Sequence, residues 1–236
     1  MTFSLGDIHI DLIQKEIKNI HLSVMPPDGN VRIAAPLNLT PETIRLYAIS
    51  KLEWIKKQQK KIRGQQRESK RLFINKETHY YQGRKYMLKI VPSTASPKIK
   101  LDKSTIYMHI SESSSPEKRQ EVINEWYRTQ LKTTVADMIS TWEQKIGVTA
   151  SIWRIRSMKT KWGSCNTDHK SILLNLELAK KPLHCIEYIV VHELVHLLER
   201  KHNDRFISLL NHHLPNWRHY KDELNKLPVS HPGWEY

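Results

Sequence analysis

The sequence predicts an α+β protein, with a small β-rich N-terminal region that includes one long helix, followed by a domain with a short antiparallel sheet and a helix that carries a histidine motif. Two patterns lead to this fold class. Before residue 113, several short runs alternate apolar and polar residues, as half-buried strands do. After the polar residues 111–116, apolar residues recur at helical spacing. We therefore expect two regions, residues 1–113 and residues 114–236.

Composition limits the class of protein. The 236 residues are 39% hydrophobic and 26% charged, which predicts a folded chain. No apolar run approaches the roughly 20 residues that cross a bilayer, so we expect no membrane association. The two cysteines form no disulfide framework and the N-terminus lacks a signal-peptide pattern, so we expect a cytoplasmic protein. The net charge of +14 suits polyanionic partners, although it is equally typical of a surface that binds nothing in particular.

The N-terminal elements begin with two alternating runs, residues 8–13 and 17–25, which we expect to be strands. A strong turn signal, Pro-Pro-Asp-Gly-Asn, follows at residues 26–30. The chain then returns as a strand at residues 31–35, which predicts a hairpin.

A long helix is expected next, over residues 41–63, with Thr40 as its N-cap and Pro41 in its first position. Its end is basic, which is usually a solvated face, and the alternative is a surface for nucleic acid or nucleotide polyphosphate. The basic residues are Lys56, Lys57, Lys60, Lys61, Arg63 and Arg67.

Further strands are predicted at residues 80–91, interrupted by Gly83, and at residues 99–101 and 106–110. An apolar stripe at helical spacing then predicts a helix from residue 116 to a C-terminal cap at Gly147.

The C-terminal region is expected to contain strands at residues 151–156 and 171–178, joined through a loop or strand end at residues 158–166. Pro182 opens the next helix, which runs through an apolar segment. Two short helices complete the chain, at residues 204–211 and 215–225.

The helix after Pro182 contains His192-Glu193-Leu194-Val195-His196. Residues four apart lie on one helical face, so His192 and His196 can direct two imidazoles at one metal ion. Glu193 projects about 100° away and can still reach a water on that metal. This is the His-Glu-x-x-His arrangement of zinc hydrolases, in which Glu193 would be the general base.

A catalytic zinc site needs a third protein ligand and keeps one position open. His202, ten residues after His192, is the favoured candidate. The intervening residues contain no glycine, so we expect the helix to end near Arg200 and Lys201 or Asn203 to accept the turn. A downstream acid such as Glu223 is the competing third ligand.

Several motifs together resemble the YgjP-like metallopeptidase family, which is related to SprT-like and other zincin proteases. They are Met158-Lys159-Thr160-Lys161-Trp162-Gly163-Ser164-Cys165, Ile172-Leu173-Leu174-Asn175, Val191-His192-Glu193-Leu194-Val195-His196-Leu197, His202 with Phe206, and Pro215-Asn216-Trp217. The dense match spans residues 156–224, and a weaker one covers residues 35–55. Lys201, Asn203 and Ile207 depart from residues common in the family.

The resemblance implies a small N-terminal β-rich region and a compact zincin-like metallopeptidase domain. It also implies zinc on His192, His196 and His202, with Glu193 catalytic. We therefore expect a zinc-dependent hydrolase, and a metallopeptidase acting on peptide or protein first of all. Members of the family are also described as metal-dependent nucleotide hydrolases, so a nucleoside triphosphate pyrophosphohydrolase is the first alternative. A non-catalytic, nucleic-acid-associated zinc protein is the second.

Substrate contacts are expected near this site. In zincins an edge strand beside the metal helix pairs with extended peptide, and residues 171–178 are the candidate strand. Asn175 would then either touch substrate or make a strand-end hydrogen bond. Trp162, Gly163 and Ser164 are expected close to the site, where Gly163 permits close backbone approach and the amides either hold an oxyanion or form a structural bulge.

Overall fold

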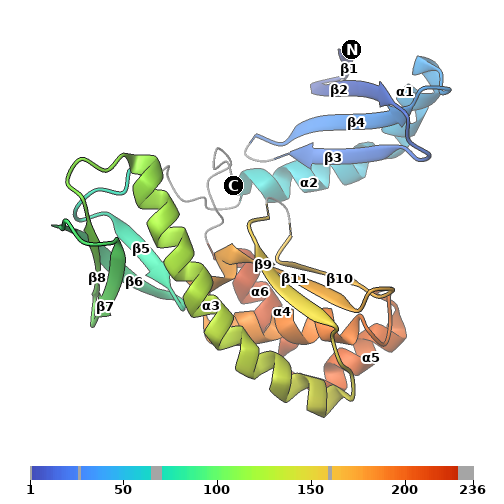
Figure 1. Ribbon diagram of the computed structural model, residues 1–236. Coiled ribbons are helices and arrows are strands. Elements are labelled where there is room, and N and C mark those ends of the chain that lie inside the picture. Colours follow the sequence, from blue (N-terminus) through green and yellow to red (C-terminus); the bar gives the residue numbers. More distant parts are fainter. Residues whose placement is uncertain (1, 26–27, 65–70, 159–160, 228–236) are drawn as a thin grey trace. The chain divides into compact units, whose positions relative to one another are not determined.

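The computed structural model describes residues 2–25, 28–64, 71–158 and 161–227. The chain divides into two compact units, Met1–Ser69 and Lys70–Leu227 (Figure 1). Each unit has its own hydrophobic core. The boundary expected from the sequence, between residues 113 and 114, falls inside the second unit.

The N-terminal unit contains a four-stranded sheet in the order β1-β2-β4-β3. Its strands are β1 (Thr2–Leu5), β2 (Ile8–Lys15), β3 (His21–Met25) and β4 (Asn30–Pro36). β3 and β4 are antiparallel, which confirms the predicted hairpin, whereas β2 runs parallel to β4. The second predicted strand begins at His21 instead of Ile17, because the Ile17 amide donates to the Lys15 carbonyl oxygen (2.8 Å) in a tight turn.

Two helices, α1 (Pro41–Ser50) and α2 (Leu52–Gly64), replace the single helix that the sequence predicts. The Thr40 side chain accepts the Thr43 amide at 3.3 Å, which confirms the predicted N-cap. The break lies at Lys51, where φ is −105° and ψ is 6°. No proline or glycine marks this break, so the pattern of apolar residues could not reveal it.

The second unit begins with a four-stranded sheet, in the order β5-β6-β8-β7. Its strands are β5 (Thr78–Tyr81), β6 (Arg84–Pro92), β7 (Lys98–Asp102) and β8 (Thr105–Ile110), as the sequence predicts. Gly83, between β5 and β6, has a φ of +78°, and a Cβ there would lie 2.8 Å from Pro182 Cγ. The turn therefore needs glycine both for its backbone conformation and for its close contact with Pro182, which precedes the helix Leu183–Val195.

Helix α3 (Pro116–Ile146) is confirmed, together with the predicted cap at Gly147, where φ is 76°. Its N-cap is Ser115, whose side chain accepts a hydrogen bond from the Lys118 amide. Its buried residues share one hydrophobic core with the inner face of the β5–β8 sheet, for example Ile123 with Leu88 and Ile106. That shared core explains why the units do not divide after residue 113. The polar segment there only links β8 to the helix that covers its sheet (Figure 1).

A smaller sheet contains β9 (Ile152–Arg156), β10 (Gly163–Asn166) and β11 (Ser171–Asn175), in the order β10-β11-β9. It is mixed instead of purely antiparallel, because β11 runs parallel to β9 and antiparallel to β10. β11 is shorter than the expected strand at residues 171–178. The chain turns at Asn175 into the 3-10 helix η1 (Leu176–Lys180), because the Asn175 side chain accepts the Glu177 amide at 3.2 Å.

The remaining helices are α4 (Leu183–Val195), α5 (Asp204–His213) and α6 (Trp217–Lys226). Helix α4 is buried on most sides, as its continuous apolar sequence requires, and its exposed residues are few. Helices α5 and α6 both pack against it. Among the described residues, none of the helices combines the length and the apolar character needed to cross a membrane.

Candidate active site

Three histidines converge at the C-terminal end of α4. His192 lies in the last turn of this helix and His196 is its C-cap, so their side chains share one face. His202 returns to them from the segment before α5. The three candidate ligand nitrogens all lie within 4.8 Å of one another, so the structure brings together the set that the sequence singled out.

The turn that brings His202 back differs from the expected one. Helix α4 ends at Val195, before the expected end near Arg200, and its last turn tightens as the Leu197 amide bonds to the Leu194 carbonyl oxygen (3.0 Å). None of the described residues from 197 to 203 has a positive φ. Asn203 is extended (φ −91°) and caps α5, because its side chain accepts the Phe206 amide at 3.0 Å. The return needs no left-handed residue, which is why glycine can be absent.

The imidazoles are oriented for a metal ion. Nδ1 of His196 lies 3.0 Å from the Glu199 carbonyl oxygen, and since that oxygen can only accept, Nδ1 carries the proton and Nε2 keeps a free lone pair. Nε2 of His202 lies 3.0 Å from Nε2 of His192. Two nitrogens bound to tetrahedral zinc at about 2.0–2.1 Å would be roughly 3.3 Å apart. The observed spacing therefore fits a shared ion with little adjustment.

His192 is held by packing. Burial, followed by the neighbouring His196 and His202, lowers its pKa to about 3, so it is the neutral imidazole that metals bind. Its buried Nδ1 has no hydrogen-bond partner among the described residues. The rings of Tyr188 (centroid distance 5.7 Å) and Phe206 (5.0 Å) set its orientation instead.

Phe206 contacts all three histidines from α5. Its ring centroid lies 5.0 Å from that of His192, 4.6 Å from His196 and 4.7 Å from His202. The ring thus forms an apolar wall behind the three ligands. From the sequence alone, Phe206 had been noted only as part of the family resemblance.

Glu193 lies beside the histidines and is 5% exposed. Burial raises the pKa of its carboxyl group to about 8, against the opposing effect of the Lys161 ammonium. A Cβ on Gly163 would lie 2.6 Å from Glu193 Oε1 and 2.8 Å from its Cγ. Position 163 must therefore be glycine for β10 to pass this close to the carboxylate, as the sequence suggested.

Replacing Gly163 with alanine is expected to displace the Glu193 carboxylate while leaving the three histidines in place. An error of about 1 Å in a reacting group costs on the order of 100-fold in rate, so we expect a 10- to 100-fold lower kcat with the content of bound metal unchanged. Steady-state kinetics and metal analysis measure the two effects. Ser171→Ala, in the neighbouring strand, is the matched control. Unchanged kcat in Gly163→Ala would show that the close contact has no catalytic consequence.

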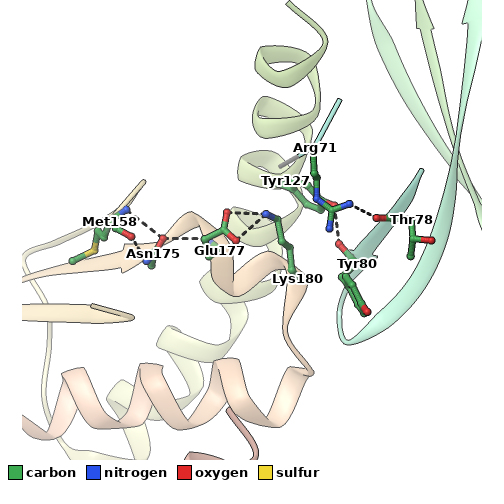
Figure 2. A network of polar contacts seen from close by, with 8 residues as sticks. All are labelled: Arg71, Thr78, Tyr80, Tyr127, Met158, Asn175, Glu177 and Lys180. Atoms are coloured by element: carbon green, nitrogen blue, oxygen red, sulfur yellow. Dashed lines mark hydrogen bonds and ion pairs between the residues drawn. The ribbon is translucent and has the colours of Figure 1, made fainter. Parts of the chain in front are cut away.

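The Asn175 side chain forms hydrogen bonds with the backbone around it. It is 4% exposed, and its Nδ2 donates to the Met158 carbonyl oxygen at 2.8 Å (Figure 2). The same Nδ2 donates to the Lys161 carbonyl oxygen at 2.7 Å. Its Oδ1 accepts the Met158 amide (3.3 Å) and the Glu177 amide (3.2 Å). These bonds favour the strand-end role over substrate contact, and they hold the chain that leads into β10.

A buried ion pair continues this network, and sequence reasoning missed it. Lys180 Nζ lies 2.8 Å from both carboxylate oxygens of Glu177, and both side chains are at most 5% exposed. Figure 2 shows Asn175, Glu177 and Lys180 in a row, with Tyr127 of α3 beyond them. The signal available in the sequence was a Glu–Lys pair three residues apart in an otherwise apolar segment, Leu176–Lys180.

The edge strand of the small sheet is not the expected one. β11 is the central strand, so both of its edges are already paired. β9 is one outer strand, and its Ile155 carbonyl oxygen already accepts a hydrogen bond from Nη1 of Arg128 at 2.8 Å. Among the described residues, no strand pairs with the outer edge of β10. β10 is therefore the strand that can accept a peptide beside Glu193.

The other sequence candidates occupy separate places. The Trp162 carbonyl oxygen accepts a hydrogen bond from the Asn175 amide (2.9 Å), so the Trp162 backbone extends the pairing of β10 with β11. Ser164 pairs with Leu173 in the same two strands. Glu223 Oε2 lies 2.7 Å from His184 Nε2, in a group separate from the three histidines. This placement favours His202 over Glu223 as the third ligand.

The basic residues of α2 belong to the N-terminal unit. Lys56, Lys57 and Lys60 are exposed, and Nε of Arg63 donates to the Asp28 carbonyl oxygen at 2.9 Å. The Lys61 side chain and the whole of Arg67 lie outside the described residues. The exposed lysines have the solvated arrangement that the sequence favoured.

Three imidazoles around one point, with a buried glutamate beside them, are typical of metallopeptidases. The family model described as YgjP-like, metallopeptidase domain, matches residues 18–227, and the chain belongs to this family. Two solved structures share 21% sequence identity with it. They are the metallopeptidase zymogens abylysin of Pyrococcus abyssi (TM-score 0.36; 38% of this chain, 90% of the other) and jannalysin of Methanocaldococcus jannaschii (TM-score 0.35; 38% and 92%). A search of curated proteins returns no match.

Proposed function

We propose that this chain is a zinc-dependent peptidase that holds the ion on His192, His196 and His202 and uses Glu193 as general base. The observation that carries this proposal is the convergence of three imidazole nitrogens beside a buried glutamate. All three donors are nitrogen atoms and leave a fourth position open, which is the donor set of catalytic zinc. Bound there, the ion lowers the pKa of a water molecule and polarises a carbonyl group.

Glu193 performs the proton transfers. It lies one residue after His192, so it reaches the same space from an adjacent direction on α4. Burial raises its pKa to about 8 in the metal-free chain, and a nearby dication favours the carboxylate form that accepts a proton. Glu193 then takes a proton from the attacking water and delivers it to the leaving nitrogen.

The unpaired edge of β10 is an argument for a peptide substrate. In an antiparallel pair, alternate residues direct their N–H and C=O groups away from the partner strand. The bond from the Asn175 amide to Trp162 fixes this alternation, so Gly163 and Cys165 face the open edge. Since Gly163 touches Glu193, a peptide added to this edge passes directly beside the general base.

Pairing with the β10 edge makes a prediction about the substrate. Methylating single backbone nitrogens along a cleaved peptide is expected to lower kcat/KM at every second position, by roughly 10-fold for each hydrogen bond of about 1–1.5 kcal/mol that is lost. The intervening positions are the internal controls. Equal effects at all positions would contradict strand addition.

Nucleotide pyrophosphohydrolysis is the second candidate, and two cations favour it. The Lys161 ammonium lowers the pKa of Glu193 and the Lys221 ammonium lowers that of His192, and positive charges that act on the site favour an anionic substrate such as a phosphate. The two functions separate in one screen of the zinc-loaded chain against unfolded proteins, peptides and nucleoside triphosphates, with and without chelator. We expect chelator-sensitive peptide cleavage. Chelator-sensitive pyrophosphate release without proteolysis would overturn the first proposal in favour of the second.

A further inference from the structure

A second group of metal-ligand side chains lies at the other end of α4. His184, Cys185 and Glu223 each offer one ligand atom, and these atoms lie within 4.8 Å of one another. His184 Nε2 and Glu223 Oε2 are 2.7 Å apart. His219 Nε2 is 4.0 Å from the same carboxylate oxygen. The group shares no residue with His192, His196 and His202.

The fold brings these residues together from two helices. His184 and Cys185 occupy the first turn of α4, after Pro182 starts the helix. His219 and Glu223 are four residues apart on α6, so they present two side chains on one face. Helix α6 packs against α4, and the Tyr220 ring lies 5.0 Å from that of His184. The Cys185 thiol points to the same place, with Sγ 3.6 Å from the Tyr220 carbonyl oxygen.

The chemistry of this group suits zinc. Thiolate sulfur and imidazole nitrogen are the preferred ligands of structural zinc, and a carboxylate oxygen is an accepted one. One thiolate and one carboxylate together carry two negative charges, which neutralise a dication. Burial and the Glu223 carboxylate raise the pKa of the Cys185 thiol to about 12, against the opposing effect of the Lys181 ammonium, so zinc binding at this group releases the thiol proton.

We propose that His184, Cys185 and Glu223 form a second zinc site that joins α6 to the start of α4. It stabilises the packing of the helix that carries the catalytic ligands. It is separate from the catalytic ion and does not depend on the chemistry proposed for that ion.

Cobalt distinguishes the two sites, because only the second contains sulfur. The full chain is stripped with chelator and titrated with Co²⁺, which replaces zinc in such sites. We expect a thiolate-to-cobalt charge-transfer band in the near ultraviolet and two ions per chain. Cys185→Ser is expected to abolish the band and remove one ion, whereas the matched control Cys165→Ser keeps both. The double variant His192→Ala/His196→Ala is expected to keep the band and lose the other ion.

Glu223→Gln provides a second test if Cys185→Ser fails to fold, as circular dichroism would show. It is expected to weaken the band and to reduce the rise in Tm that zinc gives to the His192→Ala/His196→Ala background. Absence of the band in the folded wild type would overturn the second site. So would loss of the band in Cys165→Ser, with Cys185→Ser unaffected. If peptidase activity were absent while the band remained, only the proposed function would fail.

Discussion

Glu193→Gln is expected to lower kcat by about 10²- to 10⁴-fold while the chain keeps its zinc. Glutamine has nearly the shape of glutamate, so it fits the space beside Gly163, where the carboxylate is 5% exposed. It cannot accept and return a proton, and it removes no ligand, because the proposed metal ligands are the three histidines. Steady-state peptide hydrolysis and metal analysis on the same preparation measure the two effects.

The control for this variant must change an acid of the same helix that lies outside the site. Glu187 accepts a hydrogen bond from Nε1 of Trp142 at 3.1 Å. It lies in the first half of α4, whereas His192 and His196 lie at the end of this helix. Glu187→Gln keeps an acceptor for this bond and is expected to keep kcat. If Glu193→Gln turned over as fast as the wild type, the general-base role would be wrong.

His202→Ala is expected to remove the catalytic zinc and, with it, the activity. Two imidazoles from one helix remain, and they cannot complete a three-ligand site. Changes that only disturb a ligand's surroundings typically cost 10- to 100-fold in affinity, so loss of a ligand should weaken zinc binding by at least about 100-fold. Competition with a chromophoric chelator measures the affinity.

His212→Ala is the matched control for His202→Ala, because His212 is an exposed histidine of α5 outside both metal groups. It is expected to leave zinc affinity and activity unchanged. If His202→Ala kept both, the third ligand would have to be another group, and Glu223 would be the first to test.

The central motif could be predicted from the sequence because it is local. His192, Glu193 and His196 lie within one helical turn, and helical geometry alone fixes how they face one another. Some strands and caps could be predicted for the same reason, for example the caps Thr40 and Gly147 and the hairpin of β3 and β4. These features depend on neighbours in the chain.

The features that were missed depend on tertiary packing. Whether β10 or β11 forms the edge of the small sheet is set by the order of strands, and both have sequences compatible with either place. The unit boundary was misplaced because the polar residues before α3 look like a linker, while the core that crosses them is assembled from distant residues. His184, Cys185 and Glu223 are likewise far apart in sequence, and only the packing of α6 on α4 joins them.

The most direct test of a zinc peptidase at His192, His196 and His202 is a zinc titration of the chelator-stripped chain, monitored by peptide hydrolysis. We expect no cleavage without metal, a rate that rises with added zinc to a plateau, and no comparable rise for Glu193→Gln at any zinc concentration. Wild-type protein that cleaves peptide equally well without zinc, or Glu193→Gln that follows the wild-type curve, would contradict this function.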